Sequence, residues 1–322
     1  MLLLATAMLC PSLCTSEARA DETIWRNHMA TAAEAAKRGD HAAAVQMYTA
    51  AARQAEAFAA NDVRHAATFY GLARAYRARH DYPPAEKNYL RALVVLETVN
   101  GPSHERNASV LHGLADLYRV QGRYPEAEDY YQRELAILEK TLGPEHPAVA
   151  QALSNNLAAL YRAQMRRDEV TGLYLRALAI LEKALPANDS QLGLALIDLA
   201  EWYHRQQRYD DAEPYYRRGI PIVEKQFPPA HPRVLMLLND WGQVRQLQGR
   251  YPEAESVYKM MLALIEKAHG PKHPNVGVAL NNLVGVYEVQ GRRAEADAAR
   301  KRMLEAANTP FRAQPYVPHQ GR

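Results

Sequence analysis

Four histidines recur at regular intervals, and histidine is the residue type that most often binds metal ions in proteins. Each one stands where a turn is expected to lead into a helix: His104, His146, His231 and His273. Equivalent positions in stacked helical hairpins lie roughly 16–20 Å apart, whereas zinc binds nitrogen at about 2.0 Å. One ion cannot bridge such positions. We therefore interpret the four histidines as turn residues that precede helices, and we predict no metal site.

The other common patterns of catalysis are missing from the sequence. It contains no Gly-rich phosphate loop, no His-Glu-x-x-His and no nucleophile elbow. Both cysteines, Cys10 and Cys14, lie in the first twenty residues, so a chain that begins after residue 20 has no thiol. We predict that the protein is not an enzyme and carries no cofactor.

The first twenty residues resemble a secretory signal peptide. They are apolar from Met1 to Leu13 and end in Ala18-Arg19-Ala20, which places small residues where signal peptidase requires them. Pro11 interrupts the apolar run, which is shorter than the ~20 residues that span a bilayer. We predict cleavage after Ala20 and a periplasmic or secreted protein with no integral membrane segment in the mature chain. The alternatives are an uncleaved apolar extension and a lipoprotein.

The charge of the chain excludes little and names no partner. The sequence has 322 residues, with 39 Lys and Arg against 36 Asp and Glu, a formal net charge of +3. Such a small imbalance does not indicate a nucleic-acid-binding protein. We predict a protein or peptide partner and no nucleic acid.

Columns of identical residues recur every 42 residues, with one step of 43. The first is Tyr76, Tyr118, Tyr161, Tyr203, Arg245 and Tyr287. An Ala column (Val170 in one copy), a second Tyr column that starts at Tyr48, and a Glu column follow in register: Ala85, Ala127, Ala212, Ala254, Ala296; Tyr89, Tyr131, Tyr174, Tyr216, Tyr258; Glu97, Glu139, Glu182, Glu224, Glu266. A period of this length indicates a stacked repeat array.

Apolar residues within one period have helical spacing on two segments, so each repeat is predicted to be a helical hairpin. Gly122, Gly249 and Gly291 suit the left-handed position after the first helix. Pro84, Pro125 and Pro252 suit the first turn of the second helix. The Ala column is expected where the two backbones of a hairpin approach closely.

These columns resemble the tetratricopeptide repeat, and the 42-residue period with Leu280-Asn281-Asn282-Leu283 is similar to the kinesin light chain variety. Six repeats match from about residue 62 to residue 307, and a degenerate one covers residues 21–60. The resemblance implies an all-α, right-handed superhelical solenoid of antiparallel helix pairs. We thus expect a signal peptide at 1–20, about seven hairpins at 21–307, and a disordered tail at 308–322.

In such a superhelix the first helix of each hairpin lines a concave groove, so its polar face presents candidate binding residues. These are Arg74, Arg77, His112, Asp116, Arg119, Asn155, Asn156, Arg162, Asp198, Glu201, His204, Asn239, Asp240, Gln243, Gln246, Asn281, Asn282 and Glu288. The row begins basic and becomes acidic. Asn side chains donate and accept at once, so they can pair with the backbone of an extended peptide.

The function expected from the row is an exported, non-catalytic scaffold that binds an extended peptide or protein segment. A carboxylate-binding clamp would need more Lys and Arg near the Asn side chains than Arg119 and Arg162 supply. The alternatives are a hydrated concave surface without a ligand, and a structural or self-assembling repeat protein.

Three departures from the repeat predict local changes. The extra residue near Ser154 predicts a π-bulge or a shifted helix start. Gly219 and Pro221 predict a kink or break in a second helix. Arg300, in the second Tyr column, and the charged residues around it predict a capping hairpin with a polar outer face.

Overall fold

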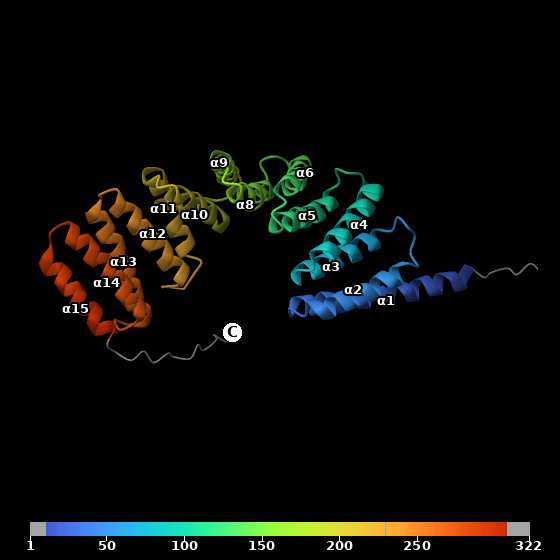
Figure 1. Ribbon diagram of the computed structural model, residues 1–322, viewed down its shortest axis with the longest axis horizontal. Coiled ribbons are helices and arrows are strands. Elements are labelled where there is room, and N and C mark those ends of the chain that lie inside the picture. The colour runs from blue at the N-terminus through green and yellow to red at the C-terminus, as the bar shows by residue number, and fades with distance from the viewer. Residues whose placement is uncertain (1–10, 229, 308–322) are drawn as a thin grey trace, which may run out of the picture. The chain divides into compact units, whose positions relative to one another are not determined.

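The computed structural model describes residues 11–228 and 230–307, with the side chains of residues 21–228 and 230–306 (Figure 1). Within these ranges every regular element is helical. The elements are α1 (Pro11–Lys37), α2 (His41–Ala55), α3 (Val63–Ala78), α4 (Tyr82–Asn100), η1 (Glu105–Asn107), α5 (Ala108–Val120), α6 (Tyr124–Leu142), α7 (Pro147–Gln151), η2 (Ala152–Leu157), α8 (Ala158–Ala163), α9 (Arg167–Ala184), α10 (Ser190–Arg205), α11 (Tyr209–Glu224), α12 (Pro232–Leu247), α13 (Tyr251–His269), α14 (Pro274–Val289) and α15 (Arg293–Ala307). The predicted tail at 308–322 and residues 1–10 of the predicted signal peptide lie outside the described residues.

The chain divides into two compact units, Met1–Leu173 and Tyr174–Arg322. In the first unit α1 packs on α2, α2 on α3, and so on in chain order to α6, so that consecutive helices form hairpins (Figure 1). The second unit repeats this from α10 to α15. The residues predicted to form a degenerate first repeat lie in α1, in α2 and in the turn after α2, and the two helices pack on each other. The predicted fold class, an all-α repeat solenoid of helix pairs, is confirmed.

The hairpin turns follow the predicted chemistry. Gly122, Gly249 and Gly291 have φ of +75°, +74° and +71°, the left-handed conformation expected after a first helix. Three copies of this turn hold other residues, His80, Met165 and Gln207, which take the same conformation at φ of +61°, +60° and +61°. The turn geometry therefore belongs to the repeat and not to glycine alone.

The Tyr and Ala columns form the core of the hairpins, as predicted. From Tyr89 onward the second Tyr column is at most 7% exposed, whereas Tyr48 is half-buried, and the Ala column is at most 1% exposed. Packing at this column is tight, because a Cβ atom added to Gly113 would lie 2.5 Å from the ring of Tyr89. The column therefore locks a second helix against a neighbouring first helix.

One predicted departure is confirmed and one is corrected. Residues Ala152–Leu157 form a π-helix, as the single extra residue near Ser154 predicted. Of the kink or break predicted at Gly219 and Pro221, the break is absent, because α11 runs unbroken through both. Gly219 is a contact position, where a Cβ atom would lie 2.9 Å from Cδ1 of Ile197. Pro221 removes only one hydrogen bond, in the last turn of a helix that ends at Glu224.

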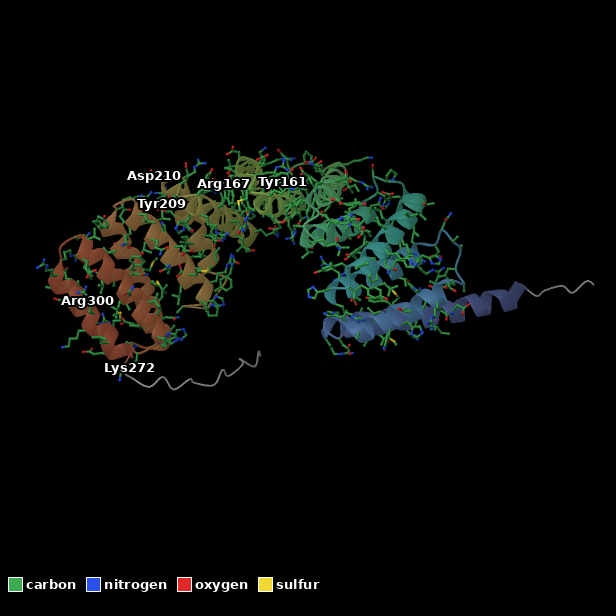
Figure 2. All side chains as sticks on the ribbon, viewed as in Figure 1. Tyr161, Arg167, Tyr209, Asp210, Lys272 and Arg300 are labelled. Carbon is green, nitrogen blue, oxygen red and sulfur yellow. The ribbon has the colours of Figure 1, made fainter. Side chains whose placement is uncertain are left out.

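The last described helix has the character of a cap. Among the side chains described for α15, only Ala296, Ala299 and Ala306 are buried, and its charged side chains are exposed or half-exposed. Arg300, labelled on α15 in Figure 2, pairs with Glu288 of α14. Across the described residues, no helix is both long enough and apolar enough to cross a bilayer.

Candidate functional site

The four regularly spaced histidines cap helices through their side chains. Nδ1 of each accepts the backbone N–H two residues later, at 3.1 to 3.2 Å. Asp62 and Asp189 occupy the same position in other repeats and cap α3 and α10 in the same way. The interpretation of the histidines as residues that precede helices is confirmed. The sequence analysis did not predict that the side chain itself caps the helix. The clue was that Asp, a preferred N-cap residue, takes the place of His in two repeats.

A polar cluster built on a glutamate recurs where α4, α6, α11 and α13 meet the next repeat. Glu86 of α4 accepts a hydrogen bond from the hydroxyl of Tyr118 at 2.9 Å and pairs with Arg123 at 3.1 Å. The guanidinium of Arg123 also lies over the Tyr118 ring, 4.2 Å from its centre. Glu128 and Glu255 repeat this arrangement with the Tyr and Arg of the following repeat. The cluster gives the hydroxyls of Tyr118, Tyr161 and Tyr287 a carboxylate partner.

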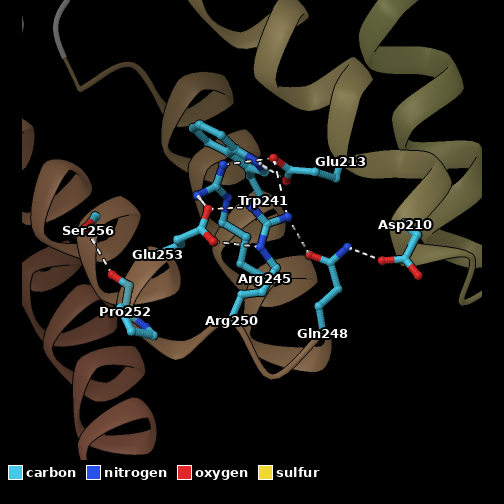
Figure 3. A network of polar contacts seen from close by, with 9 residues as sticks. All are labelled: Asp210, Glu213, Trp241, Arg245, Gln248, Arg250, Pro252, Glu253 and Ser256. Atoms are coloured by element: carbon cyan, nitrogen blue, oxygen red, sulfur yellow. Dashed lines mark hydrogen bonds and ion pairs between the residues drawn. The ribbon is translucent and has the colours of Figure 1, made fainter.

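Where Arg245 replaces this tyrosine, the cluster is rebuilt (Figure 3). Glu213 accepts hydrogen bonds from Nη2 of Arg245 and Nε1 of Trp241, both at 2.8 Å. Arg245 also bonds Glu253 at 2.5 Å, and its guanidinium lies over the indole ring. The buried charge of Arg245 is thus compensated by two carboxylates. Arg245 is a structural residue, which its place in the Tyr column indicated.

The predicted groove residues of the first unit meet around one carboxylate. Asp116 on α5 accepts hydrogen bonds from Arg77 at 2.8 Å, from Arg119 at 3.2 Å and from the hydroxyl of Tyr131 at 2.6 Å. Burial by itself would raise the pKa of Asp116, but the hydrogen bonds from Tyr131 and Arg77 hold this pKa below its usual value. Asp116 is therefore a charged anchor that orients two guanidinium groups. One carboxylate between two cations leaves a net positive charge.

The π-helix brings Asn156 to a second polar group beside Asp116. Nδ2 of Asn156 lies 3.1 Å from Oε2 of Glu134, and His112 lies 3.3 Å from the same oxygen. The hydrogen bond to Glu134 raises the pKa of His112, and Asp116 adds to this effect. These residues border a depression of about 340 Å³ between α5, α6 and η2. His112 and Asn156, both predicted from sequence, are brought together, and Glu134 was missed because it lies on a second helix.

Arg74 borders a different hollow, between the first two hairpins. This hollow of about 370 Å³ is lined by Lys37, His41, Tyr48, Arg74 and Arg77 together with small residues, and no carboxylate lines it. Within the described part of the chain no acidic group pairs with Arg74. We call Arg74, Arg77 and Arg119 the basic row.

The predicted groove residues of the second unit make hydrogen bonds through amide, imidazole and hydroxyl groups. Asn282 donates to Oδ1 of Asn239 at 2.7 Å, which joins α14 to α12. Burial raises the pKa of Asp240, which lies next to Asn239 in the chain. His204 contacts the hydroxyl of Tyr216 at 3.3 Å, and Gln246 accepts from the hydroxyl of Tyr258 at 3.4 Å. The predicted groove residues of the second unit are thus polar, and they include no arginine or lysine.

The predicted residues differ in exposure. Those that face solvent are Arg74, Asn155, Arg162, Gln243, Asn281 and Glu288. The half-buried ones are Arg77, Asp116, Arg119, Asn156, Asp198, Glu201, Asn239, Asp240 and Asn282. Their role in binding a peptide stays a prediction.

Family models assign this architecture. A model described as tetratricopeptide repeat matches residues 106–155, 149–225 and 233–309, and a second model with this description matches residues 65–106. The chain belongs to the tetratricopeptide repeat family. A search of the curated proteins gave no significant match.

Solved structures of other tetratricopeptide repeat proteins share the fold. Putative kinesin light chain TPR-like repeats from Podosopora anserina are 24% identical over 63% of this chain and 96% of that one, with a TM-score of 0.53. A signal transduction ATPase with a tetratricopeptide repeat sensor from Pyrococcus horikoshii is 16% identical over 87% of this chain and 41% of that one, with a TM-score of 0.65. The repeats are of the kinesin light chain-like type that the sequence indicated.

Proposed function

We propose that this chain is an exported, non-catalytic scaffold that binds an extended, acidic segment of another protein along the basic row of its first unit. Tetratricopeptide repeat proteins bind protein partners, and the family is generally a scaffold and not a catalyst. The proposal goes further in naming the surface and the charge of the ligand.

The observation that carries the proposal is the imbalance of charge along the basic row. Arg77 and Arg119 share the single carboxylate of Asp116, and Arg74 lines a hollow without any acidic side chain. A carboxylate of a ligand would supply the missing negative charge. Ion pairs in a half-buried hollow are screened less than pairs on an open surface.

Amide side chains next to the basic row favour an extended ligand. Asn155 is exposed and Asn156 is half-buried beside it. An Asn side chain can donate to a backbone carbonyl and accept from a backbone N–H of the same peptide. Such contacts read the backbone, so the ligand would be selected by its charge and its extended conformation.

Binding to the basic row is tested best with Arg74→Glu. Arg77 and Arg119 are unsuitable, because a carboxylate at either position would face Asp116. The probe is a fluorescein-labelled synthetic peptide in which Glu alternates with Gly and Ser, measured by anisotropy. We expect R74E to weaken binding at least about fivefold, the effect of reversing one charge at close range.

Arg53→Glu is the matched control, because Arg53 is an exposed arginine on second helix α2 and makes the same charge change. It should leave the affinity within about twofold. Equal losses in R74E and R53E would mean that only net charge attracts the peptide. No loss in R74E would refute the basic row as the site.

We propose also that the chain is cut after Ala20 and acts in the periplasm or outside the cell. The support is the apolar run followed by Ala18-Arg19-Ala20. N-terminal sequencing of the protein from fractionated cells tests this. A mature chain that starts at Asp21 outside the cytoplasm is expected, and an intact Met1 in the cytoplasmic fraction would contradict it.

A further inference from the structure

An apolar hollow lies on the first unit away from the basic row. It measures about 590 Å³ and is bordered by α3, by α4 and by Ala60 in the turn before α3. The stacked rings of His65 and Phe69 form its wall on α3. Its apolar wall on α4 consists of Leu90, Val94 and Val95. Hollows of this size are large enough to hold a ligand.

The repeat itself does not require this apolar surface. Leu90 and Val94 of α4 are 36% and 63% exposed. The equivalent positions 42 residues later, in α6, hold Gln132 and Ala136. Both helices have the same length, 19 residues, and the same buried Ala and Tyr columns. Leu90 has an exposed counterpart in Leu175 of α9, but the position of Val94 holds alanine in both α6 and α9. The pair of exposed aliphatic side chains is therefore specific to α4.

Arg91, at the edge of the hollow, lacks the acidic partner that an arginine at this repeat position has elsewhere in the chain. In three other repeats the equivalent arginine pairs with a glutamate 36 residues earlier: Arg133 with Glu97, Arg218 with Glu182, and Arg302 with Glu266. For Arg91 this earlier position is Ala55. The guanidinium of Arg91 lies instead over the ring of Phe69, 3.7 Å from its centre.

Lys87 adds a second cation on the same face of α4, one turn before Arg91. It lines the hollow and is exposed, and no acidic side chain of the described residues pairs with it. No carboxylate lines the hollow. Two cations without acidic partners beside exposed aliphatic side chains are complementary to a ligand that joins apolar side chains to carboxylates.

We infer that this hollow is a second docking surface, and that its occupant is an acidic amphipathic segment of a partner protein. Apolar side chains of the segment enter between Phe69, Leu90 and Val94, and its carboxylates pair with Lys87 and Arg91. This surface uses the outward face of α4, whereas the basic row lies on α3 and α5. One partner could therefore occupy either surface without the other.

A peptide-display selection on the full chain tests this inference. A random peptide library is selected on the immobilised protein and counter-selected on a K87E/L90Q/V94A triple variant. L90Q and V94A restore the residues that α6 has at these positions. All three side chains are exposed, so the variant should fold, and its helicity is checked by circular dichroism.

Peptides that distinguish the two targets should carry Leu, Phe or Ile within one helical turn of Asp or Glu. A synthetic copy of an enriched peptide should lose at least about tenfold in affinity for the triple variant, as measured by calorimetry. Leu175→Gln is the matched control, since Leu175 is the exposed equivalent of Leu90 in α9. L175Q and R74E should each leave the affinity unchanged.

Three results would overturn the inference. In one, no peptide distinguishes the protein from the triple variant, or the distinguishing peptides are basic. In another, L175Q weakens binding as much as the triple variant, which would indicate general stickiness. In the last, vesicles of phosphatidylcholine with phosphatidylglycerol bind through Lys87, Leu90 and Val94 while no peptide does. Weaker binding of the Glu-rich extended peptide by R74E concerns the basic row alone, so that result and the failure of this inference are distinguishable.

Discussion

Removing the charge of Glu255 should weaken the junction between the last two hairpins. Glu255 of α13 is largely buried and pairs with Arg292 at 2.5 Å and with Lys259 at 2.7 Å, and it accepts a hydrogen bond from Tyr287 at 3.2 Å. The hydrogen bond from Arg292 is the main reason why the pKa of this carboxyl falls from 4.5 to about 2. Glu255→Gln keeps the shape of the side chain and removes the charge.

The size of the effect follows from this pKa. Each pKa unit corresponds to about 1.4 kcal/mol, so the full difference sets an upper bound of ~3 kcal/mol. Arg292 and Lys259 are 33% and 58% exposed, and water screens their charges. We therefore expect E255Q to lower the free energy of unfolding by about 1–2 kcal/mol at neutral pH.

The effect should depend on pH in a defined direction. The unfolded carboxyl binds a proton near pH 4.5 and the folded one near pH 2, so the unfolded state takes up protons first as the pH falls. The contribution of Glu255 is complete above about pH 5.5 and lost towards pH 2, and about six-tenths of it remains at about pH 3.5.

Urea unfolding of E255Q and of the unchanged chain at about pH 5.5 and 3.5 measures the difference in their free energies of unfolding. Hydrogen exchange should place it in residues 274–307, because repeat contacts are between nearest neighbours. Glu295→Gln is the control, since Glu295 pairs with the same arginine but is exposed, and it should change stability little. An E255Q effect that is equal at both pH values, or an equally costly E295Q, would refute the reasoning.

Three further substitutions test the turns and the core. Gly113→Ala should lower the free energy of unfolding in urea by about 1–3 kcal/mol, because its Cβ atom would lie 2.5 Å from the Tyr89 ring. Gly172→Ala is the matched control: its Cβ atom would have no atom within 4 Å, so it should be neutral or stabilising. His273→Asp should keep the helix cap in acid, because Asp still accepts the hydrogen bond there. Burial and then His269 lower the pKa of His273. In the unchanged chain the stability from the neutral Nδ1 of His273 is therefore present above about pH 6.5 and lost as the pH falls. The melting temperature of the unchanged chain should therefore drop more than that of H273D between about pH 7.5 and 5.5, by an amount equivalent to about 1 kcal/mol, and parallel curves would argue against the cap. Met165→Gly should raise the urea midpoint slightly, because a left-handed conformation costs a side chain about 1–2 kcal/mol, and a lower midpoint would contradict the turn assignment.

The repeat columns made the hairpins predictable because each column has one physical task. A buried Tyr, a small Ala and a left-handed turn residue recur wherever two helices meet, so their spacing gives the helix boundaries. The one-residue insertion near Ser154 predicted the π-helix because both of its flanks keep their buried faces. The break at Pro221 was predicted wrongly, since a proline in the last turn removes only one bond and Gly219 is a packing position.

The site was less predictable, because polar partners come from different helices. Arg77 and Arg119 could be placed on their helices from spacing, but their shared bond to Asp116 depends on side-chain conformations that spacing does not determine. Glu134 lies on a second helix and no column marks it. The missing partner of Arg91 becomes visible only when the Arg and Glu columns are compared, which shows Ala55 in place of a glutamate.

The measurement that tests the central claim most directly is the affinity of the Glu-rich extended peptide for the unchanged chain, R74E and R53E at about 50 and 200 mM salt. If the basic row binds acidic segments, R74E weakens binding at least about fivefold at low salt, R53E does not, and the difference shrinks at high salt. Equal affinities of the three proteins, or no binding by the unchanged chain, would contradict the account.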